Sequence, residues 1–309
     1  MGVRALKEND IVDVVAPGFG CSLEDLEKAR RYLIEKGFRP RIPESIFGQC
    51  PIHSNTDEER AQQLIQALTA TDSKAVWFLR GGYGSNRLLP ALKKIKKKPR
   101  PKLTIGISDV TSLHTHFIQK WGWTSLHGSL LDRLGKGIVP PEVESELLAV
   151  VRGQQRSVNF EGLEPLNAAA LKAKSVSGQI VGGNLKVIES HVGTPDVLKF
   201  RNRLVMFEEI GERGYRVDRM LFHLDQAKAF RGCKAVLFGT FTSAEEPGPS
   251  PSTVPWVLER WAAEQSFPVY RGLPCGHDTV QRVLPLGTSA KLRLQKGLGH
   301  LEVATGVMK

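Results

Sequence analysis

The first half of the chain alternates between short apolar runs and longer amphipathic stretches. Apolar, β-branched runs within residues 10–18, 74–84 and 102–107 predict buried strands that end in glycine or a polar turn. Two stretches with helical spacing begin after Ser22 and Thr56, and a carboxylate three residues after each completes a capping box. Regular alternation of strand and helix is typical of a parallel, doubly wound sheet, whose ligands bind at the carboxyl ends of the strands.

The pattern changes near the middle of the chain. Residues 151–175 are polar, with only short strand-like pieces, and we interpret them as a linker. The alternation resumes near residue 177. The sequence therefore predicts an α/β protein with an N-terminal doubly wound parallel-sheet domain at 1–150 and a smaller C-terminal α/β domain at 176–309.

Composition limits the class of protein. Hydrophobic residues make up 41% and charged residues 24% of the 309 positions, as in soluble globular proteins. The N-terminus lacks the apolar core of a signal peptide, and no run approaches the roughly 18 apolar residues of a membrane helix. We therefore expect a cytoplasmic protein without a membrane partner. The cysteines lie far apart, without metal-ligand or disulfide-framework spacing, so neither a metal site nor a disulfide is expected. They are Cys21, Cys50, Cys233 and Cys275.

The charge is unevenly distributed. The formal net charge is +11, and residues 93–102 alone carry seven positive charges and no negative one. Faces that bind nucleic acid usually interleave basic with aromatic side chains, whereas this run has two prolines and no aromatic residue. We interpret it as a solvated connector and expect no nucleic-acid partner. A non-enzymatic module that binds phosphate or nucleic acid stays as an alternative.

Ser108 lies where a predicted strand turns into a predicted helix. A serine there can cap the helix, since the first backbone N–H groups of a helix have no partner within it. It can equally be a nucleophile, since the same N–H groups can stabilise an oxyanion. A cap is the commoner use, but the local sequence cannot decide.

Two further strand ends carry reactive groups. Glu208 and Glu209 end an apolar run, and His277 follows a glycine. Adjacent strand residues point to opposite faces, so the two glutamates cannot share a pocket. Singly, such acids are usually solvated, and such a histidine is usually a loop residue. Together with Ser108 they give the chain order Ser–acid–His of α/β hydrolases, although Val110 replaces the second glycine of the usual G-x-S-x-G turn. A serine hydrolase is thus one hypothesis.

A set of short motifs in fixed order extends over essentially the whole chain. It resembles the LD-carboxypeptidase family of serine peptidases, which remove the terminal D-alanine from murein tetrapeptides. The motifs are APG (16–18), LRGGYGSNRLL (79–89), GISDVT (106–111), GGNL (182–185), VGTP (192–195), MFEEIGE (206–212), YRVDRML (215–221) and GHDTVQRVLPLG (276–287).

The resemblance implies a site at the interface of the two domains, without metal or cofactor. It implies Ser108 as nucleophile, Glu208 as acid and His277 as base. The implied oxyanion hole consists of the backbone N–H groups of Gly82 and Asp109. Beside this resemblance, the cap and nucleophile interpretations need not compete, since Thr111 or Asp109 could cap the same turn. A carboxypeptidase also needs a cation for the substrate carboxylate, and Arg80 is the candidate.

The expected function is a cytoplasmic, metal-free serine carboxypeptidase that acts on murein tetrapeptide in peptidoglycan recycling. Relatives suggest a homodimer. An alternative is an amidase similar to the microcin-immunity hydrolases of the same family, which cleave an amide in a peptide–nucleotide antibiotic. Those tend to lack the arginine before the paired glycines, so Arg80 favours the carboxypeptidase. The sequence departs from the family pattern in its lysine-rich insertion. Some members carry Asp where Glu209 stands, a change expected to matter little.

Overall fold

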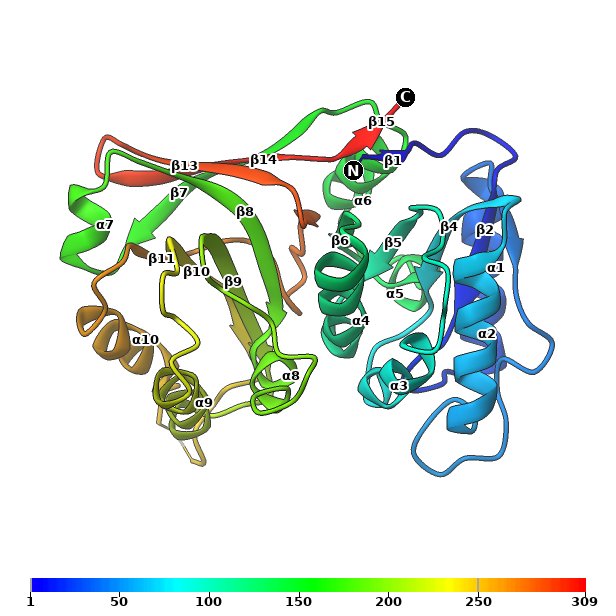
Figure 1. Ribbon diagram of the computed structural model, residues 1–309, viewed down its shortest axis with the longest axis horizontal. Helices are drawn as coiled ribbons and strands as arrows, with labels where there is room; N and C mark the ends of the chain where they lie inside the picture. Colours follow the sequence, from blue (N-terminus) through cyan, green and yellow to red (C-terminus); the bar gives the residue numbers. More distant parts are fainter. Residues whose placement is uncertain (1, 249) are drawn as a thin grey trace. The chain divides into compact units, whose positions relative to one another are not determined.

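The computed structural model describes residues 2–248 and 250–309, which form two compact units (Figure 1). The N-terminal unit comprises the chain up to Arg156 together with residues 279–285 and 305–309. The C-terminal unit comprises residues 157–278 and 286–304. The predicted linear division is therefore wrong in two respects. The expected linker at 151–175 contains strand β7 (Ser157–Pro165) and helix α7 (Ala168–Lys172), and two late segments return to the N-terminal unit.

The N-terminal unit contains the predicted parallel sheet. Strand order is β12-β6-β5-β4-β2-β3, and the neighbouring pairs from β3 to β6 are all parallel. These strands are β2 (Ile11–Val15), β3 (Arg39–Arg41), β4 (Ser73–Phe78), β5 (Leu103–Gly106), β6 (Ser125–His127) and β12 (Leu284–Leu286). Apart from the short edge strand β3, they are almost wholly buried, which explains their continuous apolar runs.

Helices cover both faces of this sheet. They are α1 (Leu23–Glu35), α2 (Asp57–Thr69), α3 (Leu89–Leu92), α4 (Thr111–His116), α5 (Leu131–Gly135) and α6 (Pro141–Val151), with short helices η1 (Ser85–Leu88), η2 (Ser108–Val110) and η3 (Phe117–Trp121). The predicted caps are confirmed: Ser22 and Thr56 each accept a hydrogen bond from the backbone N–H three residues later.

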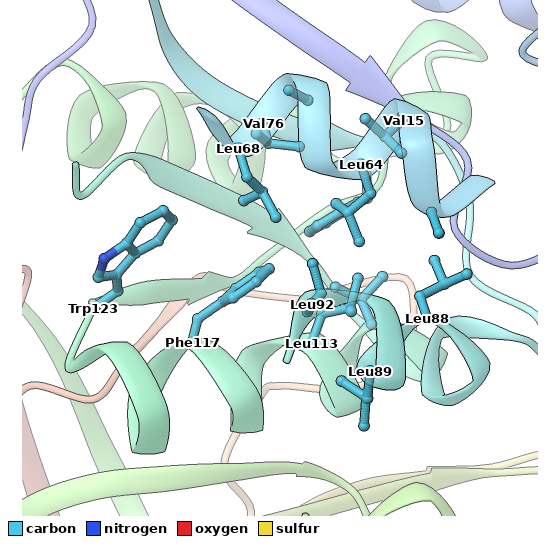
Figure 2. Packing of buried hydrophobic residues seen from close by; sticks show 14 of the residues in the cluster. Val15, Leu64, Leu68, Val76, Leu88, Leu89, Leu92, Leu113, Phe117 and Trp123 are labelled. Atoms are coloured by element: carbon cyan, nitrogen blue, oxygen red, sulfur yellow. The ribbon is translucent and has the colours of Figure 1, made fainter. Parts of the chain in front are cut away.

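The two faces of β4 have separate cores. Val76 packs in a buried cluster with apolar side chains of α2, α3 and α4, and Figure 2 shows Leu64 of α2 facing Leu113 of α4. On the other face, the Trp77 ring makes an edge contact with Tyr32 of α1. This alternation follows from the two-residue period of a strand. Packing on both faces holds the carboxyl ends of β4 and β5 between two layers of side chains.

The C-terminal unit contains a closed barrel, an architecture that the sequence did not predict. Strand order is β10-β11-β7-β14-β13-β8-β9, with β8, β9, β10 and β11 parallel to their neighbours within that group and the other pairs antiparallel. The remaining bounds are β8 (Ser175–Asn184), β9 (Arg203–Ile210), β10 (Ala235–Thr242), β11 (Val269–Arg271), β13 (Ser289–Gln295), β14 (Leu298–Ala304), α8 (Leu185–Ser190), α9 (Gly214–Gln226) and α10 (Val254–Ala263). Contacting aromatic rings of Phe207, Phe230, Phe238 and Trp261 fill part of its core.

A short parallel pair joins the chain ends. Strand β1 (Val3–Arg4) pairs with β15 (Val307–Met308) in the N-terminal unit. Among the residues that the structure describes, no helix combines the length and the apolar character needed to cross a bilayer.

Candidate active site

Ser108 occupies a sharp turn between β5 and α4. Its φ is +67°, in the left-handed region that residues other than glycine seldom adopt. Ile107 holds the cap position of η2, and neither η2 nor α4 has a side-chain cap. The cap interpretation is therefore wrong for Ser108, and also for the alternatives Asp109 and Thr111. A strained, half-buried serine two residues after the end of a central strand is the arrangement of a nucleophile elbow.

The paired glycines of the loop after β4 allow backbone to pass close to this turn. A Cβ at Gly81 would lie 2.9 Å from Cβ of Ser108 and 3.2 Å from its Oγ. Gly82 has φ +97°, and a Cβ there would overlap the Phe19 ring. Glycine is therefore required at both positions, by close approach at Gly81 and by conformation at Gly82. The structure thus brings the segment that follows β4 (residues 79–85, the glycine loop), with Gly82, beside Ser108.

Asp109 ties the same two segments together. Its side chain is 3% exposed, and Oδ2 accepts a hydrogen bond from the backbone N–H of Ser85 across 2.7 Å. Burial raises the pKa of this carboxyl, while the bonds from Ser85 and Gly84 oppose the rise. Asp109 thus contributes its carboxylate to the architecture, besides the backbone N–H expected for the oxyanion hole.

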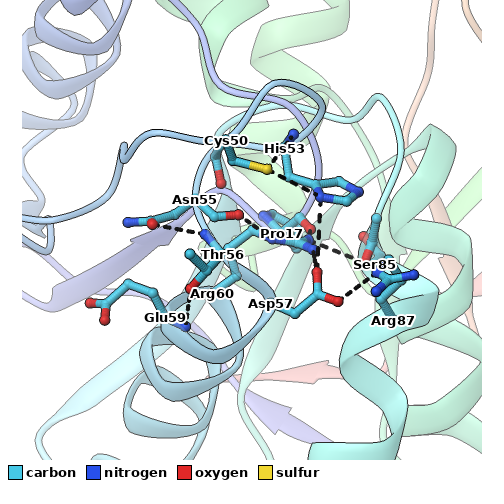
Figure 3. A network of polar contacts seen from close by, with 12 residues as sticks. Pro17, Cys50, His53, Asn55, Thr56, Asp57, Glu59, Arg60, Ser85 and Arg87 are labelled. Carbon is cyan, nitrogen blue, oxygen red and sulfur yellow. Dashed lines mark hydrogen bonds and ion pairs between the residues drawn. The ribbon is translucent and has the colours of Figure 1, made fainter.

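Arg60 is a further residue of this region that sequence reasoning missed. It is fully buried and donates to the backbone oxygens of Pro17 and Gly84, the latter across 3.1 Å (Figure 3). Its Nη2 lies 2.5 Å from Asp57 Oδ1, and the second oxygen of Asp57 accepts from Arg87 at the same distance. Arg60 therefore links helix α2 to the loops after β2 and β4. In an amphipathic helix a lone arginine looks solvent-facing, so the sequence held no signal for this role.

Arg80 lies at the start of the glycine loop. Its Nε is 3.9 Å from Oδ2 of Asp132, a loose ion pair, and 41% of its side chain is exposed. Burial raises the pKa of Asp132, and the positive charge of Arg80 opposes the rise. The long contact with Asp132 leaves the guanidinium without a close ion-pair partner there, and its exposure makes it accessible to another anion.

In the C-terminal unit, Glu208 and His277 form a close pair. His277 Nδ1 lies 2.6 Å from Glu208 Oε2, and Glu208 is fully buried. A proton on Nδ1 donates to this carboxylate and leaves Nε2 as the basic nitrogen. Gly276 precedes the histidine at φ +141°, and a Cβ there would lie 3.0 Å from Cβ of Glu208. The glycine thus lets the segment with His277 approach β9 closely enough for this contact.

Glu209 is also buried, so neither glutamate of this pair is solvated, although acids at a strand end usually are. It is 3% exposed and accepts from Asn184 Nδ2 at 2.9 Å and from the backbone N–H of Lys186 at 2.8 Å. Burial, together with the charge of Glu208, raises its pKa to about 7. The two glutamates have different partners, as the strand period requires. The side chain of Glu209 is long enough to accept both hydrogen bonds from the start of α8. The shorter side chain of an Asp at this position would lose these hydrogen bonds.

The sequence-predicted residues thus fall into two groups. Ser108, Gly82, Asp109 and Arg80 belong to loops of the N-terminal unit, whereas Glu208 and His277 belong to the C-terminal unit. Within residues 2–248 and 250–309, no three His, Cys, Asp or Glu side chains are grouped as metal ligands would be.

Comparisons with known proteins identify the family. Residues 12–128 match the LD-carboxypeptidase N-terminal domain, and residues 177–292 match the LD-carboxypeptidase C-terminal domain. The murein tetrapeptide carboxypeptidase of Pseudomonas aeruginosa is 29% identical over 91% of this chain and 92% of its own. The crystal structure of muramoyltetrapeptide carboxypeptidase from Oxalobacter formigenes superimposes with a TM-score of 0.81, at 27% identity, over 94% of this chain and 99% of that one.

The microcin C7 self-immunity protein MccF shares the fold, with a TM-score of 0.83 over 98% of both chains, at 19% identity. The resemblance inferred from the ordered motifs is confirmed, because the two matched domains together cover most of the chain. The protein belongs to the LD-carboxypeptidase family of serine peptidases.

Proposed function

We propose that this protein is a serine carboxypeptidase that hydrolyses the bond between an L-configured centre and the terminal D-alanine of murein tetrapeptide. The observation that carries the proposal is the left-handed Ser108, placed two residues after the end of the central strand β5 and beside the glycine loop. The relatives from P. aeruginosa and O. formigenes, both named for carboxypeptidase action on this class of peptide, support the choice of substrate.

The proposed mechanism uses the residues in these roles. Ser108 Oγ attacks the scissile carbonyl carbon while Nε2 of His277 accepts the hydroxyl proton. Glu208 holds the imidazole orientation and stabilises the imidazolium. The backbone N–H groups of Gly82 and Asp109 stabilise the tetrahedral oxyanion. His277 then protonates the departing amine of D-alanine, and water hydrolyses the acyl-enzyme with His277 again as base. The proposal requires residues of both units to meet in one site, as the family resemblance implies.

Arg80 is proposed to bind the substrate's terminal carboxylate. Its exposed guanidinium and loose contact with Asp132 suit a bidentate carboxylate partner. Replacing Arg80 by Met should raise KM for the tetrapeptide more than it lowers kcat, because the carboxylate is bound in both the ground state and the transition state.

The test is mass-spectrometric detection of D-alanine released from murein tetrapeptide. Wild type should remove one D-alanine, while Ser108→Ala and His277→Ala should lose at least about 1000-fold in kcat. Ser190→Ala, at an exposed serine on α8, is the matched control and should keep full activity. Full turnover by Ser108→Ala would reject the mechanism. Failure of wild type on tetrapeptide, with cleavage of an aminoacyl-nucleotide amide, would select the microcin-immunity-like amidase instead.

Three expectations from the sequence belong to the same proposal. These are a cytoplasmic location, a place in peptidoglycan recycling, and a homodimeric state. Cell fractionation tests the first, accumulation of tetrapeptide in a deletion strain tests the second, and light scattering of the purified protein tests the third.

A further inference from the structure

A cavity of about 670 Å³ lies at the amino ends of β4 and β5 in the N-terminal unit. Three chain segments line it: the turn before β4, the residues that precede β5, and the β1–β15 pair. A cavity of this size suits a small molecule. Its lining residues are Gly2, Arg4, Thr69, Ala70, Thr71, Ser73, Lys74, Lys97, Lys98, Pro99, Arg100, Pro101, Lys102 and Met308.

All charged side chains of the lining are basic. Like charges gathered in one concave site repel each other, and a bound anion would relieve that repulsion. Two carboxylates, those of Asp13 and Asp72, lie near the cavity but do not line it. Both form ion pairs with Arg41, which is also outside the lining. Of the lining cations, Lys102 is near one of them, with its Nζ 3.8 Å from Asp13. Six of the described lining residues are cationic and none is acidic; the six are Arg4, Lys74, Lys97, Lys98, Arg100 and Lys102.

The last lysine of the basic run is built into the fold. Lys102 is 5% exposed, and its Nζ lies 2.5 Å from both the Ala67 carbonyl oxygen and Oγ of Ser73. Pro99 and Pro101 restrict the backbone between the exposed lysines and this anchor. The interpretation of the run as a solvated connector is therefore wrong for Lys102, whereas Lys97, Lys98 and Arg100 are exposed. Lys94 and Lys96 belong to the same run but do not line the cavity.

The cavity is separate from the candidate active site. Lys74 is the second residue of β4, whereas Gly82 follows the carboxyl end of that strand. The six residues of β4 span roughly 20 Å at about 3.3 Å per residue. A ligand in the cavity would therefore lie at the amino ends of the strands, whereas Ser108 lies beyond their carboxyl ends.

We infer that this cavity binds a small anion with several phosphate groups, such as the polyphosphate part of a phosphorylated metabolite. Clustered lysines neutralise phosphate as point charges, and the guanidinium groups of Arg4 and Arg100 can bind phosphate oxygens in pairs. Single-stranded nucleic acid fits less well, because the described lining residues include no aromatic side chain on which a base could stack. The inference does not depend on the proposed peptidase function.

The test is isothermal titration calorimetry of the full-length protein with tripolyphosphate, with sulfate at equal ionic strength as the competing anion. Wild type should bind tripolyphosphate at least about tenfold more tightly than sulfate, because several cations act on one ligand. The double variant Lys97→Gln/Lys98→Gln should lose at least about tenfold in affinity, since two charge-assisted contacts are removed. The matched control Lys94→Gln/Lys96→Gln removes the same charge from the same run and should change affinity by less than about threefold. Arg100→Gln gives an independent variant within the cavity.

Three outcomes would overturn the inference. Equal binding of tripolyphosphate and sulfate would indicate ionic screening alone. Equal weakening by the two double variants would indicate a diffuse basic surface. Tighter binding of a single-stranded oligonucleotide, weakened by both double variants and steeply dependent on salt, would indicate a nucleic-acid surface. Thermal unfolding of each variant checks that its fold is retained, and D-alanine release should be unchanged in all of them.

Discussion

The backbone N–H of Ser85 donates to Oδ2 of Asp109 across 2.7 Å, and this bond joins the glycine loop to the turn that carries Ser108. Both residues are buried. The relative position of Gly82 and Ser108 therefore depends on a contact between side chain and backbone that lies beneath the surface of the candidate site.

Replacing Asp109 by Ala should lower kcat by about 10- to 100-fold, because the N–H of Ser85 is left buried without its acceptor and the glycine loop loses its tie. Asp109→Asn keeps an acceptor oxygen and should lose less. Steady-state kinetics of D-alanine release measures both variants. An alanine variant as active as wild type would show that the bond does not position the loop.

Replacing Arg60 by Met should lower the free energy of unfolding by about 2–4 kcal/mol, since the carbonyl groups of Pro17 and Gly84 lose their donor and Asp57 loses a buried partner. Arg87→Met is the matched control, because Arg87 binds the same carboxylate from an exposed position. It should cost less than about 1 kcal/mol. Urea unfolding measures both, and equal losses would contradict the role assigned to Arg60.

Replacing Gly81 by Ala should lower kcat by about 100-fold, because the new Cβ would displace Ser108 from its position. Gly20→Ala is a milder substitution in the same unit, since its Cβ would lie 3.3 Å from the Phe47 ring. It should leave most of the activity. Steady-state kinetics measures the loss of activity, and circular dichroism checks that each variant is folded. Full activity of Gly81→Ala would contradict the close approach of Gly81 to Ser108.

The raised pKa of Glu209 predicts a pH-dependent stability. In the folded protein its carboxyl keeps its proton up to about pH 7, whereas in the unfolded chain it ionises near its ordinary pKa of 4.5. The folded state therefore binds more protons between these values, and its stability falls as pH rises from about 4.5 to 7. Full ionisation of Glu209 in place would cost up to about 3 kcal/mol.

Glu209→Gln cannot ionise, so its free energy of unfolding should rise relative to wild type as pH increases from about 5 to 8. Urea unfolding at several pH values measures this difference. The control Glu264→Gln, at an exposed glutamate, should show no such trend. A difference between Glu209→Gln and wild type that is constant with pH would contradict the predicted titration.

Local patterns account for what the sequence could predict. The capped helices after Ser22 and Thr56 and the buried strands of the parallel sheet depend on residues close together in the chain. The barrel was missed because its closure joins segments far apart, such as β7 and β14. One local signal was available. Within the supposed linker, Val158 and Phe160 are buried while Asn159 between them is exposed, the alternation of a strand.

The candidate site could be predicted only in part. The order of Ser108, Glu208 and His277 along the chain and the family motifs indicated which residues to examine. The roles of Arg60 and of the Asp109 carboxylate could not be predicted. Both side chains are buried with partners far away in the sequence, and the sequence does not distinguish such a charged residue from one on the surface. The left-handed conformation of Ser108 likewise depends on the loops packed around it.

The path of the chain between the two units has a consequence for how the protein is made. Strand β12 borders β6 in the N-terminal sheet, yet it is synthesised only after most of the barrel strands. A fragment that stops at residue 150 would leave the edge of β6 open to pairing with other chains. On the ribosome, the unit that begins first cannot complete its sheet until β12 has been made, so truncation at the apparent domain boundary should give an aggregating product.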